Sequence, residues 1–85
     1  MDRQLILKET AQIIRDVVDL PNLMIDEHTT AQTVEGWDSF NHINIVVAVE
    51  AHFGIKFHTS EIEELKNVGE LVDLVAERLG SQRLN

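Results

Sequence analysis

The sequence of 85 residues contains no cysteine, one proline and four glycines. Without cysteine, neither a disulfide nor a thiolate-bound metal can hold the fold together. The glycines are too widely spaced for a dinucleotide-binding fingerprint or a phosphate-binding loop. No segment repeats and none is rich in Ser, Gly and Pro, so the sequence predicts a single domain over residues 1–85.

Basic residues are also scarce. Seven lysines and arginines stand against fifteen acidic residues, which gives a formal net charge of −8. Nucleic acid and anionic membrane surfaces both attract Lys and Arg, so this balance argues against either as a partner. No apolar run is long enough to cross a bilayer, and the N-terminus lacks the pattern of a signal peptide. We therefore expect a cytoplasmic monomer, without membrane insertion, whose partners are proteins with basic patches.

Apolar side chains recur every three or four residues in three segments, which predicts three amphipathic helices. The first is stopped by Pro21, because the residue before a proline avoids the helical conformation. The last runs from Asn67, a capping residue, to Gly80. Residues 21–38 are mostly polar and are predicted to form a long ordered loop. A loop of this length in so small a domain is itself a hint of function.

The middle helix is predicted to begin at Asp38 or Ser39, both good capping residues, and to end at Gly54. A brief acidic helix follows, capped by Thr59 or Ser60. The pattern therefore predicts an all-α fold with three main helices and one short helix.

Ser39 follows Asp38, and a serine beside an aspartate raises the possibility of a serine hydrolase. The Gly-x-Ser-x-Gly elbow is absent, and His42 has no evident carboxylate to orient it. We therefore predict no catalytic residues and a protein that is not an enzyme. On spacing alone, a plain helix cap is the simpler interpretation of Ser39.

The histidines do not predict a metal site. No two of them are four residues apart on one helix, and there is no cysteine to assist, so we interpret them as surface residues. They are His28, His42, His52 and His58.

The residues around Ser39 resemble the attachment motif of the acyl carrier protein family. That motif is Asp-Ser-Leu at the start of the second helix, often with a glycine two residues before the Asp, and here it reads Gly36-Trp37-Asp38-Ser39-Phe40. The resemblance continues downstream through Ile43, Val46, Val47, Glu50, Phe53, Gly54, Phe57, Ile62 and Val68.

The resemblance implies a small right-handed four-helix bundle of the acyl-carrier type. It implies that a phosphopantetheinyl transferase moves a 4'-phosphopantetheine arm from coenzyme A onto the Ser39 hydroxyl. An acyl-loading ligase or acyltransferase and downstream acyl-consuming enzymes would be the other partners. Asp38 resembles the family residue that caps the helix and helps to hold the metal of the transferase.

The same resemblance suggests which residues partners recognise and which shelter the cargo. For recognition by the transferase and by partners, the expected residues are Asp38, Phe40, Ile43, Glu50 and Phe57. For a pocket that shelters a short acyl chain, they are Val47, Ile62 and Val68. Two points stay open: Phe40 is either exposed for docking or part of the core, and Trp37, favoured as a link between loop and helix, could instead contact partners.

The second helix departs from the carriers of fatty-acid synthesis, which display several carboxylates along it. The matching positions here hold Asn41, Asn44, Ala51 and His52, and Glu50 alone is acidic. We therefore expect a stand-alone carrier with specialised partners in a lipid, polyketide or aminoacyl pathway. The rival from another class is a helical interaction module without a prosthetic group.

Overall fold

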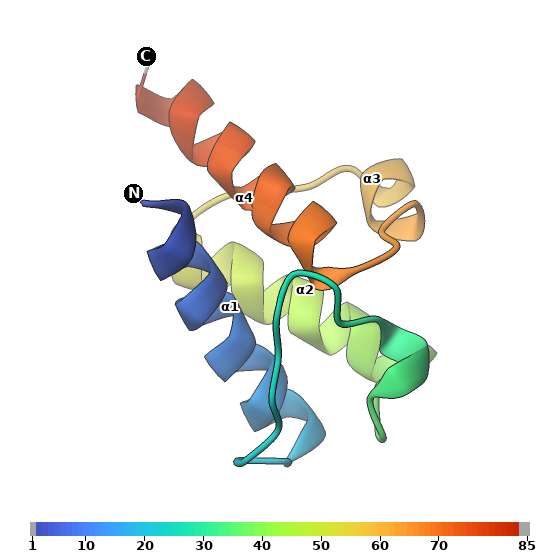
Figure 1. Cartoon of the computed structure of the whole chain (residues 1–85). Helices are drawn as coiled ribbons and strands as arrows, with labels where there is room; N and C mark the ends of the chain where they lie inside the picture. Colours follow the sequence, from blue (N-terminus) through green and yellow to red (C-terminus); the bar gives the residue numbers. More distant parts are fainter. Residues whose placement is uncertain (1, 84–85) are drawn as a thin grey trace.

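The computed structural model describes the backbone of residues 2–83 and the side chains of residues 2–80. The main helices are α1 (Arg3–Val18), α2 (Ser39–Phe53) and α4 (Val68–Arg83), and α3 (Thr59–Glu63) is the short one (Figure 1). A single 3₁₀ turn, η1 (Ala31–Thr33), lies within the long loop. The all-α fold with three main helices and one short helix is thus confirmed. Within the described part of the chain, no helix has the length and hydropathy required to span a membrane.

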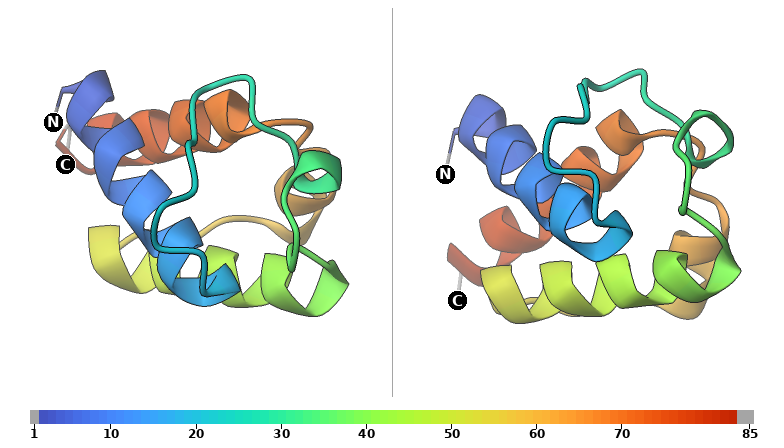
Figure 2. Two further views of the ribbon diagram at one scale, coloured as in Figure 1. Left: turned by 60° about the horizontal axis from the view of Figure 1, so that its bottom comes forward. Right: turned by 90° about the horizontal axis from the view of Figure 1, so that it is seen from below.

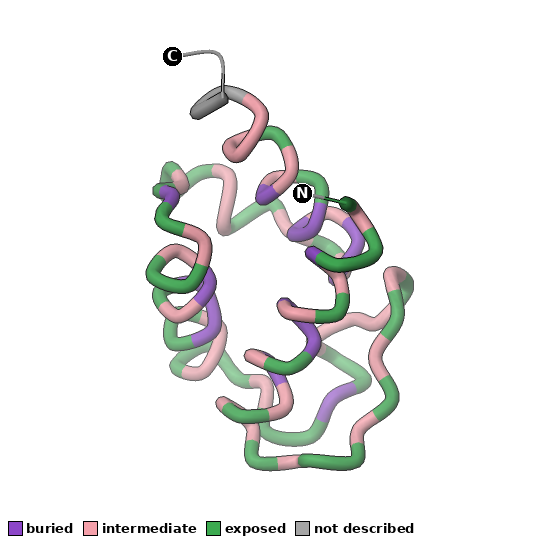
Figure 3. Tube along the Cα trace, turned by 90° about the vertical axis from the view of Figure 1, so that its left-hand side faces the viewer, coloured by how far each residue is buried: buried purple, intermediate pink, exposed green. Residues whose placement is uncertain are grey.

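The core forms where the main helices meet. α1 packs against both α2 and α4, and the buried stretches of the helices face one another (Figure 3). Removing these aliphatic side chains from water is the main force that holds the domain together. The buried cluster comprises Ile6, Ile14, Ile45, Val49, Ile55, Val68, Leu71, Val72 and Val75.

The long loop passes the start of α4 on its way from α1 to α2 (Figure 2). There the carbonyls of Thr29 and Glu27 accept hydrogen bonds from the N–H groups of Val68 and Gly69, both at 2.9 Å. These N–H groups have no acceptor inside their own helix, so the loop satisfies them. A Cβ at Gly69 would lie 3.0 Å from the Glu27 carbonyl oxygen, so any larger residue would push the loop back by a few tenths of an ångström.

Three helix ends differ from the sequence prediction. α1 ends at Val18, before Pro21, because Asp19 adopts the left-handed conformation with φ of 60°. The N-cap of α3 is His58 rather than Thr59 or Ser60. α4 continues beyond Gly80 to Arg83, since Gly80 has no positive φ that would turn the chain out of the helix.

The short helix α3 is held by one carboxylate. Glu61 accepts a hydrogen bond from the backbone N–H of His58 at 2.9 Å and forms an ion pair with Arg78 of α4. Arg78 also donates to the carbonyl of Lys56, just before α3, at 3.1 Å. The His58 N–H, and after it the Arg78 guanidinium, lower the pKa of the Glu61 carboxyl from its ordinary value.

This shift predicts an acid-sensitive contact. A carboxyl with a lowered pKa in the folded protein stabilises it above the ordinary carboxyl pKa of about 4.3, and the stabilisation is lost as the pH falls through the folded value. We expect Glu61→Gln to be less stable than wild type at a pH of about 6, with the difference shrinking towards a pH of about 3. Urea unfolding at the two pH values measures this.

Glu63→Gln is the matched control, because it removes a charge from an exposed position of the same helix. Its difference from wild type should stay small at both pH values. A Glu61→Gln difference that does not change with pH would contradict the role of the Glu61 carboxylate.

Candidate functional site

Ser39 is the first residue of α2 and its side chain is exposed. The helix begins here because Asp38 has extended backbone angles and its carboxylate accepts a hydrogen bond from the N–H of Asn41 at 2.8 Å. An N-cap of this kind leaves the next backbone N–H groups pointing along the helix axis without intrahelical acceptors. The predicted start of the second helix at Asp38 or Ser39 is therefore confirmed, with Asp38 as the cap.

The turn before α2 is hydrogen-bonded to the first turn of that helix. Gly36 has a φ of 87°, in the left-handed region that strains other residues, and it lies against Val18 at the end of α1. The side-chain amide of Asn41 donates to the Gly36 carbonyl at 2.7 Å. The turn that carries Trp37 and Asp38 is thus hydrogen-bonded to α2 and lies close to Val18 of α1.

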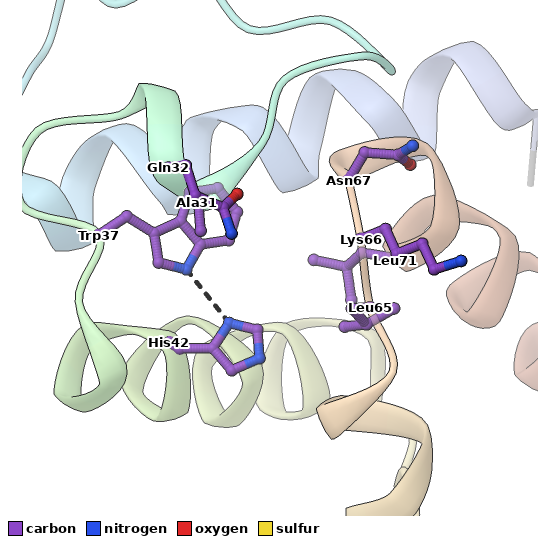
Figure 4. A pocket seen from close by; sticks show the side chains of 8 residues that line it. All are labelled: Ala31, Gln32, Trp37, His42, Leu65, Lys66, Asn67 and Leu71. Atoms are coloured by element: carbon purple, nitrogen blue, oxygen red, sulfur yellow. Dashed lines mark hydrogen bonds between the residues drawn. The ribbon is translucent and has the colours of Figure 1, made fainter.

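Trp37 and His42 form a hydrogen-bonded pair (Figure 4). The indole Nε1–H donates to His42 Nδ1 at 3.1 Å, and the rings stack with an interplanar angle of 26°. Since Nδ1 accepts, we assign the ring proton of neutral His42 to Nε2, which lies 3.3 Å from the carbonyl oxygen of Ile62. The interpretation of His42 as a surface residue was therefore wrong, because it is half-buried and bonded on both sides. The favoured interpretation of Trp37 as a link between loop and helix agrees with this bond.

Two cavities adjoin the pair. The one beside Ser39, here called the outer cavity, has a volume of about 760 Å³. The other, called the inner cavity, lies against Leu65 and Leu71 and has a volume of about 210 Å³ (Figure 4). The outer cavity is lined by Ala31, Gln32, Trp37, Asp38, Ser39, His42, Ile43, Thr59, Ile62 and Glu63.

The residues predicted for partner recognition fall into two groups. Phe40 and Ile43 are 74% and 61% exposed beside Ser39, so the alternative that Phe40 belongs to the core is excluded. Glu50 and Phe57 lie at the other end of α2, where the Glu50 carboxylate accepts the backbone N–H of Phe57 at 2.8 Å. The Phe57 ring packs against the core.

The three residues predicted to shelter an acyl chain do not surround one cavity. Ile62 lines the outer cavity. Val47 is 56% exposed and Val68 is fully buried in the core. The sequence interpretation missed Thr59 and His42 as cavity residues. No helical spacing relates the short helix to Ser39, and His42, although it lies three residues after Ser39 on α2, was interpreted as a surface residue.

Comparison with known proteins assigns the chain to a family. Residues 8–75 match the family model described as the phosphopantetheine attachment site. The chain belongs to the acyl carrier protein family. It is 30% identical over 76 residues to an acyl carrier protein of Acidothermus cellulolyticus, a match that covers 89% of this chain and 90% of the relative.

Solved structures agree with this carrier assignment. The holo acyl carrier protein of Geobacter metallireducens is 37% identical, with a TM-score of 0.85 over 93% of this chain and 91% of the other. The acyl carrier protein of Thermotoga maritima is 25% identical, with a TM-score of 0.82 over 95% and 94% of the two chains.

Carriers of this family present their cargo to other proteins and do not catalyse reactions, so the prediction that the chain is not an enzyme is confirmed by its family. The phosphopantetheine cofactor is likewise confirmed. In general terms, a phosphopantetheinyl transferase and acyl-handling enzymes are the partners of such a carrier.

Asp38 offers a direct test of how the site is built. Asp38→Ala removes the acceptor of the Asn41 N–H and should lower the free energy of unfolding by about 0.5–2 kcal/mol. Asp38→Asn keeps a capping oxygen, so its free energy of unfolding should stay within about 0.3 kcal/mol of the wild-type value. Urea unfolding monitored by helical circular dichroism measures both. Equal losses in the two variants would show that Asp38 acts through its charge and not as a cap.

Proposed function

We propose that this chain carries acyl or related groups as thioesters on a phosphopantetheine arm attached to Ser39. One observation carries the proposal: Ser39 is exposed at the first position of α2, directly after the capping Asp38, inside the segment that matches the attachment-site model. The arm, when attached, supplies a terminal thiol that holds the cargo.

The residues around Ser39 fit a phosphodiester. The first N–H groups of α2 and the positive end of its dipole favour a negative group at this position. Asp38 already binds the Asn41 N–H, which leaves the N–H groups of Ser39 and Phe40 without an acceptor among the described residues. The outer cavity opens beside the Ser39 side chain and offers apolar surface from Ile43 and Ile62.

The exposed face of α2 supports the proposal of specialised partners. Phe40, Ile43 and Val47 are all exposed and lie three and four residues apart, so they form one apolar stripe on the helix. Glu50, the sole acid of α2, is engaged by the Phe57 N–H. Partners that dock on α2 would therefore meet an apolar surface with little charge. The pathway, whether lipid, polyketide or aminoacyl, and the cytoplasmic, stand-alone and monomeric state stay predictions.

The attachment is tested by incubating the protein with coenzyme A, magnesium and a broad-specificity phosphopantetheinyl transferase and then weighing it intact. Wild type should gain the mass of one phosphopantetheine, and Ser39→Ala should gain none. Ser60→Ala, at an exposed position of α3, is the matched control and should be modified as wild type is. No gain in wild type would favour the interaction module instead.

Specialised docking is tested on the acyl form with a general fatty-acid ketosynthase. We expect elongation to be slower than on a fatty-acid carrier with an acidic second helix. The substitutions Asn44→Glu and Ala51→Glu, both at exposed positions, introduce carboxylates on α2. They should raise the kcat/KM of the ketosynthase for this carrier by about tenfold at low salt, because complementary charge speeds association.

The uncharged pair Asn44→Gln and Ala51→Gln is the control and should leave kcat/KM unchanged. The gain from the carboxylates should fade as salt is added. If the wild-type protein is elongated as fast as the fatty-acid carrier with an acidic second helix, specialised docking is ruled out.

A further inference from the structure

His42 contacts the turn before α2 through one ring nitrogen and α3 through the other. Its Nδ1 accepts the indole N–H of Trp37 at 3.1 Å (Figure 4), and its Nε2 lies 3.3 Å from the carbonyl oxygen of Ile62. An indole N–H can only donate and a carbonyl oxygen can only accept, which assigns the proton of the neutral ring to Nε2. The Trp37 bond therefore exists only while Nδ1 carries no proton.

A second proton on the His42 ring breaks one of these bonds and keeps the other. The proton, taken from solvent, binds at Nδ1, where it turns the acceptor of the Trp37 N–H into a second donor. The Nε2–H group still donates to the Ile62 carbonyl, and the positive charge of the ring strengthens that bond. Protonation thus converts His42 from a link between the loop and α3 into a residue bonded to α3 alone.

The charged groups around His42 allow its ring to carry a positive charge in place. Three charged residues line the two cavities that His42 also lines: the carboxylates Asp38, just before α2, and Glu63, on α3, and the ammonium of Lys66, between α3 and α4. From α4 itself the lining residue is the uncharged Leu71. Two carboxylates against one ammonium favour an imidazolium over its expulsion, and the half-buried ring keeps part of its hydration.

We propose that His42 is a proton-sensitive switch that releases the turn carrying Trp37, next to Ser39, while it keeps α3 in place. Histidine is the side chain whose charge ordinarily changes between a pH of about 5 and about 8, so the switch acts within this interval. Trp37 lines both cavities, and its turn leads directly into Asp38 and Ser39. The loop side of the site is therefore released as the pH falls, whereas the start of α2 stays fixed, because the bond between Asp38 and Asn41 involves no histidine.

The test follows the indole N–H of Trp37 in ¹H–¹⁵N spectra of the full chain without an attached arm. Trp37 is the only tryptophan, so its indole gives one signal. As the pH is lowered from about 8 to about 5, the proton signal should move upfield, because the N–H loses its acceptor. The midpoint of this shift should coincide with that of the ring protons of His42. Helical circular dichroism should stay constant, because the turn is released without unfolding of the helices.

Two variants separate His42 from the other histidines. His42→Asn offers a side-chain oxygen near the position of Nδ1 that accepts the Trp37 N–H and does not titrate in this interval. Its indole signal should stay at one position across the whole pH range. His52→Asn removes a histidine from an exposed position of the same helix and is the matched control. It should show the same upfield shift as wild type.

A wild-type indole signal that stays constant between these pH values would overturn the switch, and so would a shift that persists in His42→Asn. Helical circular dichroism that is lost together with the indole shift would also overturn it, because the proton would then unfold the domain. If His42→Asn does not fold, the two midpoints in wild type decide, and different midpoints overturn the switch. None of these outcomes bears on the attachment at Ser39, since the protein is measured without the arm.

Discussion

The hydrogen bond from the Asn41 N–H to the Asp38 carboxylate determines where α2 begins, and the site depends on that position. It makes Ser39 the first residue of the helix, exposed and next to N–H groups that favour a negative group. A start one turn later would move Ser39 into the loop, away from the helix dipole. The second bond of Asn41, to the Gly36 carbonyl at 2.7 Å, holds the preceding turn in the same place.

A second set of contacts links this start to the rest of the domain. The Trp37–His42 bond joins the loop to α2, and His42 in turn reaches the Ile62 carbonyl of α3. α3 is anchored to α4 through Glu61 and Arg78. The proposed attachment residue Ser39 and the cavity beside it are therefore shaped by segments that are far apart in sequence.

The helices and the start of α2 could be predicted from the sequence because they depend on local signals: apolar periodicity and a capping residue at Asp38. The position of Phe40 could not, since a helical stripe of apolar residues does not reveal which side meets the core. The Trp37–His42 pair was missed for a related reason, because Trp37 lies in a turn whose path depends on Gly36 and on the contact with α1. The residues predicted for the acyl pocket do not line one cavity, because Val47 is exposed to solvent and Val68 is buried in the core.

The central claim is that the first turn of α2 holds the phosphodiester of the arm. Amide ¹H–¹⁵N spectra of the protein before and after phosphopantetheine attachment test it most directly. The account predicts that the largest shifts fall on Ser39, Phe40 and Asn41, with small changes at the cavity residues Thr59 and Ile62 and none in the middle of α1. Shifts centred on Ser60, or spread evenly over the chain, would contradict it.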